Sequence, residues 1–253
     1  MSNIEKISSK DALGLKIGCV TLTKPFFKKA GIADNNSKNL PFSLSTYKGL
    51  PVQYMNQVHG TSVQVINDYV YEPIENTDAL FTGSNKVSLA IMSADCLPIA
   101  IANSEGTEIA LIHAGWRGLA SGIIDKTLKM FDLDNKELKA WLAPCISQKE
   151  YEVGKDVYEA FTKVDEESVK SFMKINSRKW LFDLKDQAKR ILEKSEVSVS
   201  QSNYCTYNDE ELFYSYRRDK TDKRALTLLW RKDVEQGGHR IRCNGIGNGW
   251  AYF

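Results

Sequence analysis

Cys96 and His113 are the residues whose types and spacing first indicate chemistry. They lie in two apolar, β-rich runs, residues 87–102 and 108–113, which the turn-prone stretch 103–106 separates. This pattern predicts a β-hairpin with Cys96 directly opposite His113. Opposed side chains share a face with Cβ atoms about 5 Å apart, so a thiolate and an imidazole there could bind one metal ion. Cys96 taken alone could also be a small buried core residue.

His59 is the third candidate ligand. Residues 52–66 read as two strands with a break at His59-Gly60, which would hold this imidazole on rigid backbone. Together His59, Cys96 and His113 have the ligand types of a catalytic zinc ion with a fourth position left for water. Asp78 could orient one of the histidines, or it could cap the turn in which it lies. A solvated His59 without a metal is the alternative.

Two arginines are candidates for binding an anion. Arg117 lies in the small-residue turn 114–118, between a predicted strand and a predicted helix, where free N–H groups and the helix dipole favour negative charge. Arg217, in the run 215–218 at a predicted strand end, could bind a carboxylate or phosphate. Exposed charges that discourage aggregation of an edge strand would look the same.

The remaining elements follow from apolar periodicity and turn residues. A helix is expected after a capping box at residues 147–150, and another is expected with Asp183 as its cap. Residues 28–39 are expected to form a loop. Pro98 predicts an edge strand or a bulge near the site, because it lacks an N–H. Further strands are expected at residues 15–22, 141–146, 197–204, 212–217 and 225–231.

Length and composition predict one cytoplasmic domain. The chain has 253 residues, 42% of them hydrophobic, and we expect a catalytic domain over residues 1–231 followed by a loosely attached glycine-rich tail, 232–253. The net charge of +2 gives no basic field for nucleic acid, and neither a signal peptide nor a membrane span is apparent. The five cysteines form no close pair, so reduced thiols are expected. In the tail, His239 and Cys243 could bind metal only adventitiously.

Five segments of the chain together match the pattern of a known family. They are NQVHG (56–60), SADCLPI (93–99), HAGWRGL (113–119), YEVG (151–154) and FYSYRRD (213–219). In this order they resemble the bacterial laccase-domain proteins, a family also named multicopper polyphenol oxidase, peptidoglycan editing factor and purine nucleoside phosphorylase, and the resemblance covers residues 50–231. It implies an α/β (α+β) fold, a single-domain sandwich of mixed β-sheets flanked by helices. It also implies a metal held by His59, Cys96 and His113.

One family signature differs in this chain. Family members usually carry Thr-Arg-Gly-Gly-Val-Ser near the N-terminus, whereas the corresponding region here has Thr23, Lys24 and Pro25. If the family's arginine helps to hold phosphate, Lys24 could replace it in part as a point charge.

The expected function is that of a zinc-dependent enzyme acting on purine nucleosides, with copper as the other possible metal. Two imidazoles and a thiolate on zinc would activate water for deamination of adenosine. The resemblance adds phosphorolysis of adenosine, inosine, guanosine or methylthioadenosine, with phosphate held by Arg117 and Arg217. Asn56 and Gln57 could bind the base or ribose, or belong to a structural amide network.

Three other functions stay open at this point. Without a metal, Cys96 and His113 could form a thiolate–imidazolium pair in a hydrolase that edits peptidoglycan precursors. A copper-dependent polyphenol oxidase would need several copper centres, for which three histidines and one candidate cysteine are too few. A partner-binding protein without catalysis would leave the joint occurrence of the five segments unexplained.

Overall fold

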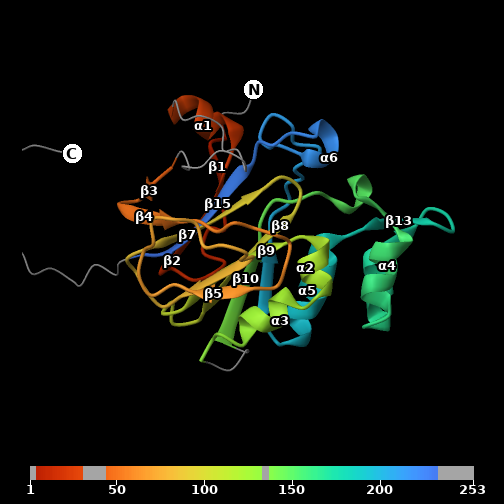
Figure 1. The fold of residues 1–253 in the computed structure, drawn as a ribbon, viewed down its shortest axis with the longest axis horizontal. Coiled ribbons are helices and arrows are strands. Elements are labelled where there is room, and N and C mark those ends of the chain that lie inside the picture. Colours follow the sequence, from red (N-terminus) through yellow and green to blue (C-terminus); the bar gives the residue numbers. More distant parts are fainter. Residues whose placement is uncertain (1–3, 31–43, 133–136, 233–253) are drawn as a thin grey trace, which may run out of the picture.

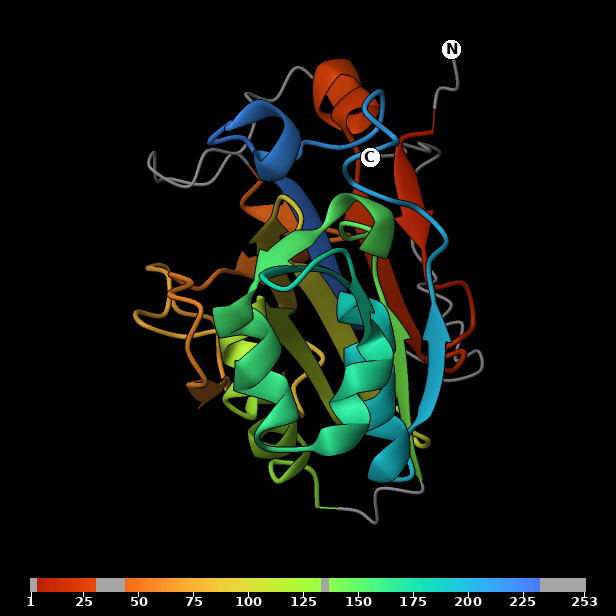
Figure 2. The same ribbon diagram turned by 90° about the vertical axis from the view of Figure 1, so that its right-hand side faces the viewer.

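The chain folds into a sandwich of two mixed β-sheets with helices outside them (Figures 1 and 2). This computed structural model describes residues 4–30, 44–132 and 137–232. Apolar side chains of both sheets share one core cluster, and a second cluster joins one sheet to the helices. The predicted fold class is therefore confirmed.

The first sheet has the strand order β1-β2-β15-β7-β4-β3. Antiparallel pairing of β15 with both β2 and β7 forms its centre, and β4 joins β7 in parallel. The strands predicted at residues 15–22 and 225–231 are confirmed by β2 and β15. The bounds are β1 (Lys6–Ser8), β2 (Ile17–Leu22), β3 (Thr46–Tyr47), β4 (Leu50–Gln53), β7 (Ser88–Ser93) and β15 (Ala225–Arg231).

The second sheet has the order β14-β10-β8-β9-β6-β5, with the predicted hairpin, β8 and β9, at its centre. Both faces of these two strands are buried, which explains why they read as continuous apolar runs. In β8, Ile99 faces the helices and Ala100 faces the first sheet. The bounds are β5 (Val63–Val65), β6 (Ala79–Thr82), β8 (Leu97–Asn103), β9 (Ile109–Ala114), β10 (Leu138–Leu142) and β14 (Ser198–Gln201).

The hairpin register differs from the predicted one by two residues. Pro98, not Cys96, lies opposite His113. The turn is longer than predicted because the Asn103 side chain accepts hydrogen bonds from Thr107 N (2.9 Å) and Glu108 N (3.2 Å). A slip of two residues keeps every side chain on its face, whereas a slip of one would have reversed them.

Pro98 lies in a central strand, so the edge or bulge predicted from it is wrong. β8 pairs with β9 on one side and with β10 on the other. The carbonyl of Pro98 accepts from Ala143 N (3.0 Å), so its nitrogen faces the same side. The β10 register ends at Leu142, opposite Ile99, so the missing N–H falls at the very end of the ladder, where it costs only the last hydrogen bond.

The helices lie mainly over the outer face of the second sheet (Figure 2). Asp183 caps α5 as predicted, because its side chain accepts from Asp186 N. The predicted loop at residues 28–39 is wrong at its start, where α1 continues to Ala30, and the rest of it lies outside the described ranges. The bounds are α1 (Lys24–Ala30), α2 (Trp116–Ala120), α3 (Ile123–Leu128), α4 (Lys155–Thr162), α5 (Leu184–Lys194) and α6 (Tyr216–Asp219), with 3-10 helices at Gln148–Glu150 and Glu166–Ser171.

The helix predicted directly after residues 147–150 does not begin there. The chain instead enters β11 (Glu152–Gly154), the first strand of a small sheet with β13 (Lys179–Phe182) and β12 (Phe172–Lys174), and α4 follows only after Gly154. Pairing with β13, distant in sequence, outweighs the local capping signal.

Two strand predictions also need correction. Residues 212–217 do not form a strand, because Leu212 N and Phe213 N donate to the carbonyl of Asp209 and Ser215 then caps α6. The strand expected at 141–146 is β10, which ends at Leu142.

The predicted tail, including His239 and Cys243, falls on residues outside the described ranges, apart from Lys232. Among the helices that the structure describes, none has the length and apolar character needed to cross a bilayer.

Candidate active site

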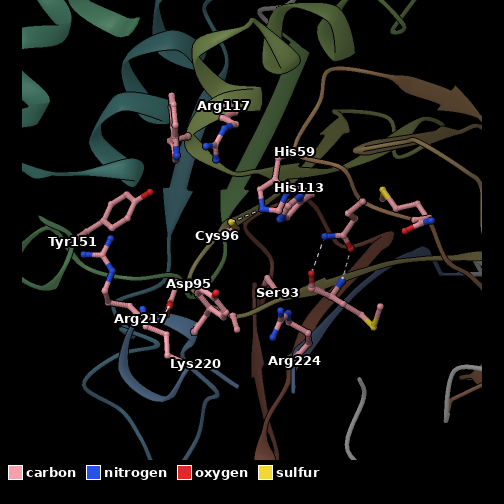
Figure 3. Close-up of a pocket in the computed structure, with 17 residues that line it drawn as sticks. His59, Ser93, Asp95, Cys96, His113, Arg117, Tyr151, Arg217, Lys220 and Arg224 are labelled. Carbon is pink, nitrogen blue, oxygen red and sulfur yellow. Dashed lines mark hydrogen bonds between the residues drawn. The ribbon is translucent and has the colours of Figure 1, made fainter. Parts of the chain in front are cut away.

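Three side chains from separate segments converge in the wall of a pocket (Figure 3). His59 comes from the loop between β4 and β5, Cys96 immediately precedes β8, and His113 lies in β9. Their ligand atoms all lie within 4.8 Å of one another. The Cys96 Sγ atom is 3.7 Å from His59 Nε2, and the two imidazole rings have centroids 4.9 Å apart. The structure therefore brings together the three residues predicted as metal ligands.

Asp78 fixes both histidines at once. Its buried carboxylate accepts backbone hydrogen bonds from Val58 (3.2 Å), His59 (2.9 Å) and Gly60 (2.7 Å), which hold the loop with His59 in the left-handed region at φ +61°. The same carboxylate lies 2.9 Å from His113 Nδ1. Because a carboxylate only accepts, Nδ1 carries a proton, and Nε2 is the ring nitrogen that can bind a metal. Asp78 thus caps the turn and also orients a histidine.

Two glycines permit this close packing. A Cβ atom on Gly115 would lie 2.7 Å from His59 Cδ2 and 3.2 Å from Cys96 Sγ. A Cβ atom on Gly118 would lie 2.6 Å from the carbonyl oxygen of Gly60. The glycine before α2 and the glycine within it are therefore required by contact with the His59 loop, a reason that the sequence pattern did not reveal.

Cys96 and His113 shift each other's protonation. Burial raises the pKa of the Cys96 thiol, but the charge of His113 and hydrogen bonds from both histidines outweigh it and lower this pKa to about 6. Burial lowers the pKa of His113, yet the Cys96 charge and the Asp78 hydrogen bond raise it to about 9. Near neutral pH the sulfur is a thiolate, the form that binds metals and attacks electrophiles.

The ligand cluster opens into a cavity of about 540 Å³ that also carries aromatic and cationic side chains. The Arg117 guanidinium lies over the Trp116 ring, 4.4 Å from its centroid. Across the cavity, Arg217 lies 5.1 Å from the centroid of the Tyr151 ring, and its Nη1 donates to the carbonyl of Glu152 (2.9 Å). Both arginines predicted to bind an anion thus line the same pocket as the ligand cluster.

Asp95 is a site residue to which the sequence analysis assigned no role. Its buried carboxylate accepts from Thr206 Oγ1 (2.7 Å), Ser215 Oγ (3.0 Å) and Arg217 N (2.6 Å). Its backbone has φ +91°, which an L residue adopts only when its surroundings enforce it. Asp95 therefore attaches the segment with Arg217 to the residue next to Cys96.

The side chains of three other predicted residues make hydrogen bonds within the protein. Gln57 borders the pocket, but its amide donates to the carbonyl of Met92 (2.8 Å) and accepts from Met92 N (3.0 Å). Asn56 also borders the pocket and donates to Glu75 Oε2 (2.9 Å). Lys24, expected to replace a family arginine, is not among the pocket residues and donates to the carbonyl of Glu210 (2.7 Å).

Comparisons with known proteins place the pocket in a wider context. Residues 31–232 match the family described as multi-copper polyphenol oxidoreductase laccase. A protein of Escherichia coli (strain K12) named purine nucleoside phosphorylase YfiH is 36% identical over 200 residues, which are 78% of this chain and 80% of that protein. A purine nucleoside phosphorylase of Xylella fastidiosa (strain Temecula1) is 37% identical over 191 residues, 72% of this chain and 74% of the relative.

Solved structures share the fold. The crystal structure of the Neisseria meningitidis protein NMB0706 has a TM-score of 0.77 and 30% identity, and the match covers 90% of this chain and all of the other. YlmD from Geobacillus stearothermophilus has a TM-score of 0.75, with 92% of this chain and 98% of the other covered. At 20% identity, the second likeness concerns the fold alone.

Proposed function

The chain belongs to the family of laccase-like multi-copper polyphenol oxidoreductases, and we propose that it is a metal-dependent enzyme that catalyses the phosphorolysis and the deamination of purine nucleosides. The observation that carries this proposal is the convergence of three metal-type ligand atoms beside a pocket lined by arginines and aromatic rings. The names of the relatives supply the substrate class.

The residues present fit a zinc ion. The donor set of His59, Cys96 and His113 has the ligand types of catalytic zinc sites, in which three protein ligands leave one position open. The carboxylate–histidine contact of Asp78 is the usual support for a ligand imidazole. When bound, zinc would supply a Lewis acid able to activate water near neutral pH, and copper is the alternative metal for this donor set.

Phosphorolysis requires the pocket to hold a nucleoside and a phosphate together. We assign phosphate binding to Arg117 and Arg217, whose planar guanidinium groups suit a phosphate oxygen pair. A phosphate oxygen attacks C1′ of the ribose, the C1′–N9 bond breaks, and its electron pair goes to N9, which takes up a proton. The products are the free purine and ribose 1-phosphate. Trp116 and Tyr151 offer ring faces against which the purine can stack.

Deamination would use the same pocket without phosphate. Water adds at C6 of adenosine and ammonia leaves, so inosine is the product. Cys96, His59 and His113 would act here as metal ligands, and the metal site that they form would lie close to the purine.

The test is incubation of purified, zinc-loaded protein with adenosine, with and without phosphate. We expect inosine without phosphate, and adenine, hypoxanthine and ribose 1-phosphate with it. Cys96→Ser and His113→Ala should abolish both reactions, and Arg117→Met should raise the KM for phosphate at least tenfold. Lys129→Met, which removes an exposed cation outside the pocket, is the matched control. Product formation no higher than in His113→Ala would refute the proposal.

One contact favours a second candidate, a metal-free cysteine hydrolase that edits peptidoglycan precursors. The Cys96 sulfur and His59 Nε2 are 3.7 Å apart, which is close enough for a nucleophile and its base. Metal analysis separates the two candidates. Stoichiometric zinc supports the nucleoside enzyme, whereas metal-free protein that hydrolyses a peptidoglycan precursor through Cys96 supports the hydrolase.

A further inference from the structure

The pocket carries more positive charge than one phosphate requires. Four of its lining residues outside the ligand cluster are cationic, and the one carboxylate in the lining, Asp95, is buried and already accepts three hydrogen bonds. The cations are thus not neutralised by the pocket wall. They are Arg117, Arg217, Lys220 and Arg224.

These cations lie in separate parts of the pocket (Figure 3). Arg117 is beside the ligand cluster, whereas Lys220 and Arg224 lie at the opposite side, beyond Ser93 and Asp95. Phosphate bound at Arg117 would therefore be remote from the second pair. Filling both regions therefore takes two anionic groups, one in each region.

Lys220 and Arg224 both lie near an exposed aromatic residue. The Nζ atom of Lys220 lies 5.0 Å from the centroid of the Tyr216 ring, and the Arg224 guanidinium carbon lies 6.0 Å from it. Tyr216 is half exposed, at 50%. Two cations beside an accessible aromatic side chain suit a ligand that combines an anionic group with an apolar body.

The structure holds both cations in place without pairing them to an acid. Arg224 Nη1 donates to the carbonyls of Thr221 (2.7 Å) and Lys223 (2.9 Å), so this group is oriented while its Nη2 remains available. Lys220 has a left-handed backbone, φ +51°, where α6 ends. Within the described ranges, its Nζ atom makes a ring contact but neither a hydrogen bond nor an ion pair.

We propose that Lys220, Arg224 and Tyr216 form a second anion subsite that binds the phosphate ester of a purine nucleoside 5′-phosphate. This inference rests on the proposed function, because it places the nucleoside part between the subsite and the ligand cluster. It extends the substrate class from nucleosides to nucleotides. Inorganic phosphate is the other source of the same chemistry, and the experiment must separate the two.

The test is isothermal titration of the full, zinc-loaded chain with adenosine, adenosine 5′-monophosphate and inorganic phosphate in separate runs. We expect the nucleotide to bind about tenfold more tightly than adenosine, as two charge-assisted contacts to one phosphate ester would give. In Lys220→Met and in Arg224→Gln, the ratio of the two affinities should fall severalfold toward one. Lys223→Met, in the same segment but outside the pocket, should keep the wild-type ratio.

The outcomes are distinct. Equal affinity for adenosine and its 5′-monophosphate in the wild type would overturn the subsite and leave the proposed function intact. A loss of inorganic phosphate affinity in Lys220→Met, with the nucleotide ratio unchanged, would assign the cations to the free co-substrate and also overturn it. If neither nucleoside nor nucleotide binds, the proposed function fails as well.

Discussion

Replacing Asp78 by asparagine should destabilise the fold and weaken metal binding together. In the wild type, Oδ1 accepts from His59 N and His113 Nδ1, and Oδ2 accepts from Val58 N and Gly60 N. An asparagine has one oxygen, so in either orientation its NH₂ group faces two donors. Two hydrogen bonds to a charged acceptor are therefore lost, each worth about 1.5–3 kcal/mol, which gives about 3–6 kcal/mol.

Urea unfolding of the metal-free protein measures the first effect, and competition with a zinc chelator measures the second. We expect zinc affinity to fall about 10–100-fold, because the loop with His59 and the His113 ring both lose their common support. Asp68→Asn removes an exposed carboxylate of the same region and should change the free energy of unfolding by less than about 0.5 kcal/mol. Wild-type stability and zinc affinity in Asp78→Asn would refute this reasoning.

The loss of folding stability in Asp78→Asn should depend on pH. Burial raises the pKa of Asp78, but hydrogen bonds from His113 and Gly60 oppose this, and the net shift is downward. A carboxyl whose folded pKa lies below its unfolded value of about 3.9 stabilises the protein at higher pH, and this contribution is lost as the pH falls through the folded pKa. The stability difference between wild type and Asp78→Asn should therefore shrink below about pH 4.

Cys96 should react as a thiolate in the metal-free protein. Its alkylation by iodoacetamide should rise with pH with a midpoint near pH 6, whereas Cys145, whose pKa burial raises to about 12, should stay unmodified. Peptide mass spectrometry detects both modifications, and a Cys96 midpoint above pH 8 would contradict the pairing of its thiolate with His113. Gly115→Ala should reduce zinc affinity at least tenfold, because the new Cβ displaces His59. Gly83→Ala is the control and should bind zinc normally, because a Cβ atom there would have its nearest contact at 3.6 Å. Equal zinc affinity in the two variants would argue against a packing role for Gly115.

Local patterns predicted the centre of the fold and could not predict its exact register. Continuous apolar runs identified β8 and β9, since both faces of these strands are buried. The turn length depended on backbone hydrogen bonds that the Asn103 side chain accepts, which residue type alone does not specify. The predicted register was wrong by two residues. Because side chains alternate between the two faces of a strand, an even shift left the inferred face of His113 unchanged.

The site depends on contacts between segments distant in sequence, and this limited its prediction. The residue types suggested His59, Cys96 and His113 as a set, but their convergence requires the left-handed backbone at His59 and its support by Asp78. Asp95 gave no recognisable signal, because its partners lie 111–122 residues away. Lys220 and its neighbours were missed for the same reason.

A tertiary contact also explains the wrong strand at residues 212–217. The apolar residues there predicted a strand, yet Phe213 is fully buried within a turn and a short helix follows. Asp95 accepts hydrogen bonds from Ser215 and from Arg217 N, which favours the start of α6 at this place. Such a preference is set by the fold rather than by the local sequence.

X-ray absorption at the zinc edge, combined with metal content of the purified protein, tests the central claim most directly. We predict one zinc ion per chain with one sulfur ligand at about 2.3 Å and two imidazole nitrogens at about 2.0–2.1 Å, and loss of the sulfur signal in Cys96→Ser. A protein without stoichiometric metal, or a bound ion whose spectrum contains no sulfur, would contradict the claim that these three side chains share one metal.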